Sequence, residues 1–418
     1  MQGGKIAEER RILKMNDETK KNLERFLQYV QIDTQSDDAS PSTPSASKEL
    51  NLTKKLAGEL EELGIPHEID EFGRLYGWMK GEEGWDPIGL NAHVDTALEC
   101  SGANVKPRII EKYDGGTIVL NETYSMSPKE FPTLGEHIGD DLVVTDGTTL
   151  LGADDKAGVA AIMAVLHFFH DHPEIPHHPI SILFTPDEEI GRGPEHFNAE
   201  KFGAKYAYTI DGGYYREIAT ATFNAAHADV TLHGVSIHPG EAKGKMVNAS
   251  SLAFEFDRLL PEKKRPQFTE GFEGFNHLVA MDGSVDTAHL HYIIRNHDRK
   301  KLEEQKEEFR LAKANLEKRY PSASIELEIG DDYKNMQEVL DEHPEAVEQA
   351  KKAFAALSIE PIFPPIRGGT DGATFSFLGC PTPNLGTGSY NHHGRFEYLS
   401  VQEWETMIEI AKKILTIR

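Results

Sequence analysis

Five short segments of this sequence bring histidine and acidic residues together, and most of them directly follow an apolar run. They are Asn91-Ala92-His93-Val94-Asp95, Leu151-Gly152-Ala153-Asp154-Asp155-Lys156, Thr185-Pro186-Asp187-Glu188-Glu189, Thr209-Ile210-Asp211-Gly212 and Asn391-His392-His393-Gly394. Neutral imidazole and carboxylate groups are the ligands that hydrolases use for catalytic divalent cations. Together the five segments predict a hydrolase with two metal ions and one further carboxylate.

Each segment also has a purely structural explanation. A His-x-Asp pattern is common on surface loops, Asp154 and Asp155 suit the start of a helix whose dipole they complement, and Glu188 with Glu189 fits an exposed acidic turn. The chain has 19 histidines, so a few fall near acids by chance, and His392 is such a candidate. The joint occurrence at three predicted strand ends, one helix start and one glycine turn favours the metal site.

Local geometry suggests roles within two of the segments. His93 and Asp95 are two residues apart on a segment predicted to be extended, so both side chains project to the same face and the carboxylate can orient the ring. Glu188 and Glu189 are adjacent and point to opposite sides of an extended chain. One of them can therefore bind a cation while the other acts as a base.

The elements that must position these residues alternate between strand and helix. The predicted strands cover residues 87–92, 180–184 and 206–210, and the predicted helices cover 50–63, 156–170 and a segment capped by Asp17 that runs through Val30. Continuous apolar strands alternating with helices predict an α/β fold in which a mostly parallel sheet is flanked by helices. In such sheets the site lies beyond the carboxyl ends of the strands.

After Asp211 the pattern changes to strands with one exposed face. The predicted order is one or two strands over 220–236, a helix at 249–260, a strand at 288–295, a helix at 300–319 and a strand at 322–329. This order predicts a small α+β lid domain, residues 218–332, inserted into a catalytic dimetal domain of residues 16–217 and 333–418. Helices are predicted at 343–357 and 401–417 in the second part of the catalytic domain.

Composition and charge exclude several classes of function. The 69 acidic and 44 basic residues give a net charge of −25, which would repel a nucleic acid or an anionic membrane surface. Cys100 and Cys380 are the only cysteines and provide neither a disulfide framework nor a structural zinc motif. Residues 1–15 are charged, which predicts a flexible leader and not a secretory signal. A cytoplasmic protein acting on small molecules is predicted.

Longer stretches of the sequence resemble a known family. The five segments, in this order, are similar to the co-catalytic zinc exopeptidases, the group that includes aminoacylase, carboxypeptidase and succinyl-diaminopimelate desuccinylase. Within that group, the chain resembles the peptidase T family of tripeptide aminopeptidases from about residue 16 to the C-terminus. The stretches that carry this resemblance are 146–158, 235–240, 246–249, 292–295 and 367–373.

The resemblance implies two zinc ions per subunit that share one ligand. His93, Asp154 and Asp211 would hold one ion, and Asp154, Glu189 and His393 would hold the other. Two such ions would lower the pKa of a shared water.

The resemblance also implies two further catalytic residues. Asp95 would orient His93, and Glu188 would be the general base. The peptide bond between Asp154 and Asp155 is expected to be cis.

In the inserted domain and near residue 367, the resemblance implies substrate-binding residues. His238 would stabilise the charge on the carbonyl oxygen, Arg295 and Arg367 would grip the terminal carboxylate of the peptide, and Asn248 would also contact substrate. The insert is then expected to close over the substrate, and a homodimer through this domain is expected from relatives.

The predicted function is a metal-dependent aminopeptidase that releases the N-terminal residue from tripeptides. A related dipeptidase, carboxypeptidase or N-acyl amino-acid deacylase is the alternative enzyme. A metal-binding or solute-binding protein without catalysis is the other alternative, and an intact Glu188 argues against it because a binder needs no base.

Overall fold

The computed structural model describes residues 16–418, so the predicted leader at residues 1–15 lies outside the described residues. The chain folds into two units. Of the described residues, unit 1 contains 16–220 together with Glu338–Phe363 and Thr370–Arg418, and unit 2 contains Ala221–Gln337 together with Pro364–Gly369.

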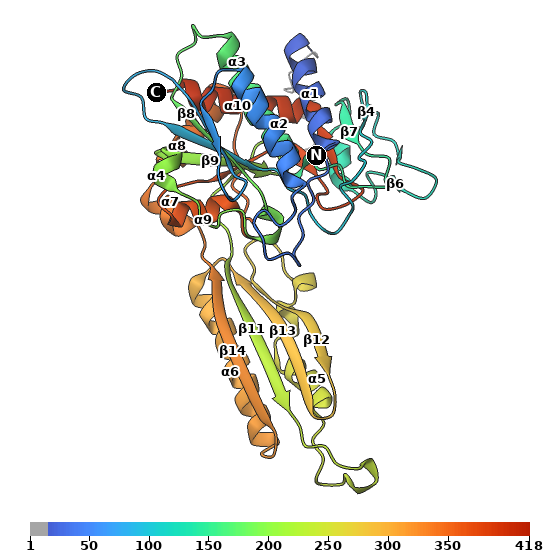
Figure 1. The fold of residues 1–418 in the computed structure, drawn as a ribbon. Coiled ribbons are helices and arrows are strands. Elements are labelled where there is room, and N and C mark those ends of the chain that lie inside the picture. The colour runs from blue at the N-terminus through green and yellow to red at the C-terminus, as the bar shows by residue number, and fades with distance from the viewer. Residues whose placement is uncertain (1–15) are drawn as a thin grey trace. The chain divides into compact units, whose positions relative to one another are not determined.

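Unit 1 is built on a seven-stranded sheet with the order β1-β2-β8-β3-β9-β15-β10 (Figure 1). Its strands are β1 (His67–Ile69), β2 (Leu75–Met79), β3 (Ile88–His93), β8 (Ile180–Thr185), β9 (Tyr206–Gly212), β10 (Ile218–Ala219) and β15 (Asn384–Gly386). The four central strands are parallel, whereas β1, β2 and β10 pair antiparallel at the two edges. The α/β fold is confirmed, and the sheet is mixed, because only its four central strands are parallel.

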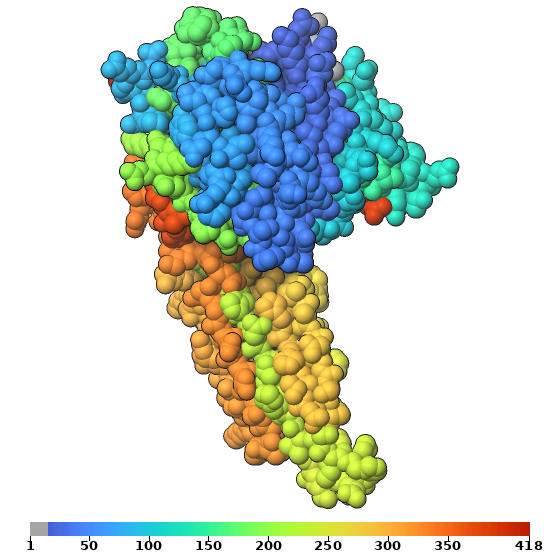
Figure 2. Space-filling view, viewed as in Figure 1, coloured from blue at the N-terminus to red at the C-terminus, as the bar shows by residue number. Residues whose placement is uncertain are grey.

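Helices cover both faces of this sheet, as predicted. They are α1 (Asp17–Val30), α2 (Glu49–Glu62), α3 (Ala153–Asp171), α4 (Ala199–Phe202), α7 (Gln337–Glu342), α8 (Glu345–Ala356), α9 (Asp371–Phe377) and α10 (Val401–Thr416). The residues of α1 and α2, coloured blue, make up much of the face of unit 1 that Figure 2 shows. The helix-capping prediction was wrong by one residue, since Asn16 accepts the N–H of Thr19 and Asp17 lies in the first turn.

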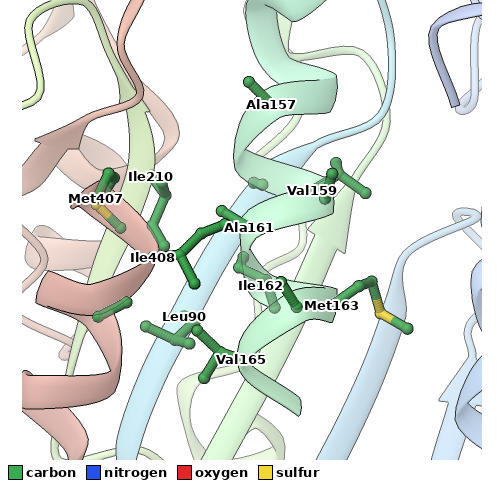
Figure 3. Packing of buried hydrophobic residues seen from close by; sticks show 14 of the residues in the cluster. Leu90, Ala157, Val159, Ala161, Ile162, Met163, Val165, Ile210, Met407 and Ile408 are labelled. Atoms are coloured by element: carbon green, nitrogen blue, oxygen red, sulfur yellow. The ribbon is translucent and has the colours of Figure 1, made fainter. Parts of the chain in front are cut away.

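The largest core of unit 1 is centred on α3. Ile162 and Val165 of α3 are fully buried with Leu90 of β3 and Ile210 of β9, and Ile408 of α10 belongs to the same cluster (Figure 3). Burying a side chain of this size contributes about 1.5–3 kcal/mol. This packing fixes the N-terminal end of α3 relative to the carboxyl ends of β3 and β9.

A smaller sheet of unit 1 was not predicted from the sequence. Its strands have the order β16-β17-β7-β4 and are β4 (Arg108–Ile110), β7 (Leu142–Val144), β16 (Ser389–Tyr390) and β17 (Tyr398–Ser400), with a separate hairpin of β5 (Ile118–Val119) and β6 (Ser125–Met126). Strands of two or three residues are too short to show an apolar period. The turn between β16 and β17 contains His392 and His393.

Unit 2 is a four-stranded antiparallel sheet with two helices. The sheet has the order β12-β13-β11-β14, and the elements are β11 (Asn224–His233), α5 (Ala249–Leu259), β12 (Phe275–Gly283), β13 (Thr287–Asn296), α6 (Arg299–Arg319) and β14 (Ser324–Tyr333). Apolar residues of α5 and α6 share one buried cluster with alternate residues of the strands. Strand β12 was not predicted, because it is largely exposed and its apolar residues do not alternate with polar ones.

The division of the chain differs from the predicted boundaries of 218–332. Pro364–Gly369 was predicted to belong with the catalytic domain, but it lies in unit 2. Backbone hydrogen bonds explain this, since Ile366 donates to Ala221 at 2.8 Å and Phe223 donates to Gly368 at 3.3 Å. These contacts join segments that are far apart in sequence, which no local pattern could reveal.

Candidate dinuclear metal site

Three parallel strands deliver predicted site residues to the same edge of the sheet. Strand β3 ends at His93, which is paired in register with Thr185 at the end of β8. Strand β9 lies on the other side of β3 and carries Asp211 as its second-to-last residue. The predicted site residues therefore lie at the carboxyl ends of the parallel strands, as the sequence predicted.

The first candidate metal group contains His93, Asp154 and Asp211. Nε2 of His93 lies 3.0 Å from Oδ1 of Asp154 and 3.5 Å from Oδ1 of Asp211. One potential ligand atom from each residue lies within 4.8 Å of the other two. His93 is almost fully buried, so its ring is held in a single place.

The second candidate group contains Asp154, Glu189 and His393. Nε2 of His393 lies 3.3 Å from Oδ2 of Asp154 and 3.2 Å from Oε2 of Glu189. Asp154 therefore directs one carboxylate oxygen to each group, which is the arrangement of a bridging ligand. His392 belongs to neither group, and its Nε2 makes a 2.8 Å hydrogen bond with the hydroxyl of Ser389.

The chemistry of these side chains fits divalent cations. Three carboxylates and two imidazoles converge, and Oε1 of Glu189 is buried without a hydrogen-bond partner among the described residues. Burial, followed by the charge of Asp154, raises the pKa of Glu189 to about 9. Metal ligands must lose their protons, and divalent cations would compensate the charge that these buried carboxylates then carry.

The two histidines respond to the same carboxylates. The hydrogen bond with Asp154 is the main cause that raises the pKa of His393 to about 10. Burial opposes protonation of His93, but Asp211, Asp154 and Asp95 together raise the pKa of this imidazole well above its usual range. The carboxylates around both imidazoles therefore favour a positive charge at this position.

The Asp154–Asp155 peptide bond is cis, as expected. The two carboxylates serve different purposes. Asp155 accepts the backbone N–H of Gly158 in α3 at 3.1 Å and that of His93 in β3 at 3.3 Å, so it joins the start of α3 to the end of β3, and Asp154 remains available to both metal groups.

The acidic turn differs from the extended segment that the sequence suggested. Glu188–Ile190 forms a 3-10 turn, and Asp187 before it has a φ of 59°. The two acidic side chains are therefore separated by a tight turn instead of by strand alternation. The single backbone N–H of Ser45 donates to both oxygens of Asp187, at 3.0 and 2.8 Å, which holds the residue in this conformation.

Asp95 joins the first metal ligand to the acidic turn. Its carboxylate accepts the backbone N–H of Glu188 at 3.0 Å and that of Glu189 at 3.1 Å, and it accepts the hydroxyl of Ser36 at 2.7 Å. Nδ1 of His93 lies 3.2 Å from Oδ1 of Asp95, at ion-pair distance although outside hydrogen-bond geometry. Asp95 is fully buried.

Glu188 lies among charged groups of the same site. Burial is the main cause that raises its pKa well above the usual range of a glutamate, and His93 opposes this while Asp211 and Asp371 add to it. A carboxyl group with a raised pKa is suited to accept a proton near neutral pH and to return it.

Two buried carboxylates near the site were not predicted from the sequence. Glu397 accepts backbone N–H groups of the loop that leads to Asp154. Asp371 bonds to the hydroxyl of Thr185 at 2.5 Å, and burial raises its pKa to about 7. Asp371 lies in the glycine-rich stretch 367–373, which carries part of the family resemblance, whereas no local pattern indicates Glu397.

The four predicted substrate-binding residues all lie in unit 2. His238 is exposed and accepts the N–H of Gly240, and Asn248 caps α5 by accepting the N–H of Ser251 at 3.2 Å. Nη1 of Arg295 donates to the carbonyl groups of Ala226 and Ile294, both at 3.0 Å, and Arg367 donates to Gly271, Glu273 and Thr269. Each residue therefore has a structural contact within unit 2, and substrate binding stays a prediction.

Comparison with known proteins places the chain in a family. The model of peptidase family M20/M25/M40 matches residues 145–416, which is more than half of the chain. The chain belongs to this family. The matched range of the M20 model includes Asp154, Glu189, Asp211 and His393, whereas His93 and Asp95 precede it.

Individual relatives of this M20 chain extend the similarity to nearly its whole length. Peptidase T of Geobacillus sp. is 48% identical over 94% of this chain and 97% of its own length, and Peptidase T of Bacillus licheniformis is 46% identical over 95% and 97%. The crystal structure of aminopeptidase PepT from Bacillus cereus matches with a TM-score of 0.75 at 23% identity, covering 95% of this chain and 98% of that one. Human carnosine dipeptidase 1 matches with a TM-score of 0.60 at 12% identity, over 95% and 96%. Among residues 16–418, no helix is long and apolar enough to cross a bilayer.

Proposed function

We propose that this M20-family chain is a metal-dependent aminopeptidase that releases the N-terminal residue from tripeptides. The observation that carries the proposal is the pair of ligand groups sharing Asp154, with the carboxyl group of Glu188 beside them. The curated relatives that are 45–48% identical over most of this chain are named Peptidase T. A tripeptide aminopeptidase fits both observations.

Zinc is the proposed metal, with two ions per chain. His93, Asp154 and Asp211 would hold one ion, and Asp154, Glu189 and His393 would hold the other. When bound, the cations would acidify a water and polarise the carbonyl group of the scissile peptide. Imidazole and carboxylate ligands suit zinc, and they also suit manganese and cobalt.

The protein side chains handle the proton. Glu188 takes a proton from the attacking water and later passes it to the leaving amine. Asp95 fixes the backbone of the turn that carries Glu188 through the N–H groups of Glu188 and Glu189. Since the turn is held at its backbone, the carboxyl group of Glu188 needs little rearrangement before the proton transfer.

Substrate binding is proposed for four residues of unit 2. Arg295 and Arg367 have fork-shaped guanidinium groups that suit the C-terminal carboxylate of a peptide. His238 would stabilise negative charge on the carbonyl oxygen, and Asn248 would contact the substrate. Small peptides are the proposed partners, a homodimer through unit 2 is the proposed assembly, and the cytoplasm is the proposed location.

The test combines metal analysis with a substrate panel. Purified protein is expected to contain two divalent ions per chain and to release the free N-terminal residue from a tripeptide faster than from a dipeptide, a tetrapeptide or an N-acetyl tripeptide. Faster release from the dipeptide or the acetylated peptide would contradict the tripeptide assignment and favour a related dipeptidase or deacylase.

The variant Glu188→Ala separates catalysis from metal binding. It removes the proposed base but no proposed ligand, so it should keep both ions and lose turnover by a factor of about 100 or more. Turnover within a few-fold of the wild-type chain would show that Glu188 is not the base.

A further inference from the structure

The carboxylate of Glu397 is enclosed by backbone N–H groups of a distant loop. Oε2 accepts the N–H of Leu151 and that of Gly152, both at 2.8 Å, and Oε1 accepts the N–H of Asp154 at 2.9 Å. The residue is 1% exposed. A buried carboxylate that receives three short hydrogen bonds is an unusually strong anchor, because charged acceptors strengthen such bonds.

The loop that Glu397 holds carries the shared metal ligand. Gly152 has a φ of 77°, and Asp154 itself has a non-helical φ and ψ at the start of α3. The first N–H groups of a helix have no partner within the helix, so the amide of Asp154 needs an acceptor from elsewhere. Glu397 provides that acceptor.

Glu397 lies in the same turn as a ligand of the second metal group. His393 precedes it by four residues, and the side chain of Asn391 donates to the carbonyl of Phe396 at 3.1 Å, which closes the turn. Tyr398 follows Glu397 in β17 and pairs with Val144 of β7, which leads towards the loop at 151–154. One turn thus presents His393 directly and holds the backbone of Asp154 through Glu397.

We propose that Glu397 is a positioning residue that sets the bridging carboxylate of Asp154 against both metal groups, so that affinity for both ions depends on it. The proposal rests on the two-metal site of the proposed function, but it concerns metal binding and not the identity of the substrate. Loss of a direct ligand such as His93 affects one group, whereas displacement of Asp154 affects two.

The variant Glu397→Gln tests this dependence. Glutamine has one oxygen, so its NH₂ group must face at least one of the N–H groups of the loop, and keeping the two bonds of Oε2 leaves the amide of Asp154 without an acceptor. Partners that orient metal ligands typically change metal affinity by about 10–100-fold. We therefore expect both zinc affinities of the metal-free protein, measured by titration calorimetry with Zn²⁺, to weaken by about this factor.

The control is Glu405→Gln, which makes the same Glu-to-Gln change at another buried glutamate of unit 1. Glu405 bonds to the side chains of Thr19 and Asn22 and contacts no proposed ligand, so its variant should bind two ions as the wild-type chain does. The variant His93→Ala should weaken one site much more than the other. Glu397→Gln with both affinities within about threefold of the control, or with only one affinity changed, would overturn the proposal.

Backbone hydrogen exchange of the metal-free wild-type chain tests the same contacts without a variant. Its result therefore does not depend on whether Glu397→Gln folds. If Glu397 holds the loop, the amides of Leu151, Gly152 and Asp154 are protected, and rapid exchange of all three would overturn the proposal. Neither measurement uses a peptide. If the wild-type chain does not cleave tripeptides, the proposed substrate is refuted. If Glu397→Gln nevertheless weakens the binding of both ions, the positioning role is supported.

Discussion

Asp95 contacts both the proposed metal ligand His93 and the turn that carries the proposed base Glu188, so we expect Asp95→Asn to impair catalysis. Oδ1 of Asp95 receives the N–H of Glu188 and faces the ring of His93, and Oδ2 receives the N–H of Glu189 and the hydroxyl of Ser36. Asparagine has only one oxygen. In either orientation its NH₂ group points at one of the two backbone N–H groups of the acidic turn.

The magnitude follows from that lost acceptor. A buried donor without a partner costs about 1–3 kcal/mol, and each 1.36 kcal/mol corresponds to a factor of about ten in rate. Asp95 is fully buried, so water cannot replace the acceptor. If the cost falls on the active arrangement of the turn, kcat/KM for a tripeptide should decrease by about 10–100-fold.

The assay compares Asp95→Asn with Ser36→Ala. The serine variant removes only the hydroxyl donor and leaves both N–H groups of the turn bonded to Asp95, so its kcat/KM should fall by no more than about fivefold. Both proteins are assayed after saturation with Zn²⁺, and metal content is measured in parallel. Equal kcat/KM values for the two variants would refute the view that Asp95 acts by holding the turn.

Two other properties can be tested in the same way. Burial raises the pKa of Glu405 to about 7, although Asn22, Lys412 and Thr19 oppose the shift. This raised pKa does not lower the free energy of unfolding below pH 4.5, the ordinary pKa of a glutamate. The loss of stability then grows until the pH passes 7. The free energy of unfolding of Glu405→Gln, measured by urea titration, should therefore gain up to about 3 kcal/mol relative to the wild-type chain between pH 4.5 and pH 8, and a constant difference would contradict this account. If Arg295 and Arg367 grip the C-terminal carboxylate, amidation of a tripeptide should slow its cleavage at least about tenfold, and equal rates for the amide and the free acid would exclude such a grip.

Much of the fold of unit 1 follows from local patterns. The apolar runs at β3, β8 and β9 and the broad apolar face of α3 are visible because burial on both sides of a sheet requires continuous apolar sequence. The short strands β7, β16 and β17 and the exposed strand β12 were missed. Their residues carry little apolar periodicity, and pairing with distant partners determines their conformation.

The residue types of the candidate site were also visible in the sequence. His93 and Asp211 stand at the ends of predicted strands, where parallel neighbours bring their side chains to one edge. The grouping of Asp154 with His393 depends on segments that lie 239 residues apart in the chain, and only the resemblance to a family suggested it. The 3-10 turn at Glu188–Ile190 was mispredicted, because the contacts of Asp187 with Ser45 impose it from another element.

The sequence by itself determined which side chains could bind cations and which strands would carry them, because residue type and apolar periodicity are local properties. Only the tertiary structure decided how those side chains are held. Asp95 and Glu397 act through backbone N–H groups of other segments, and every residue type except proline can supply such a donor. The sequence therefore contains no pattern that marks the donors, and their roles emerge only when the chain is folded.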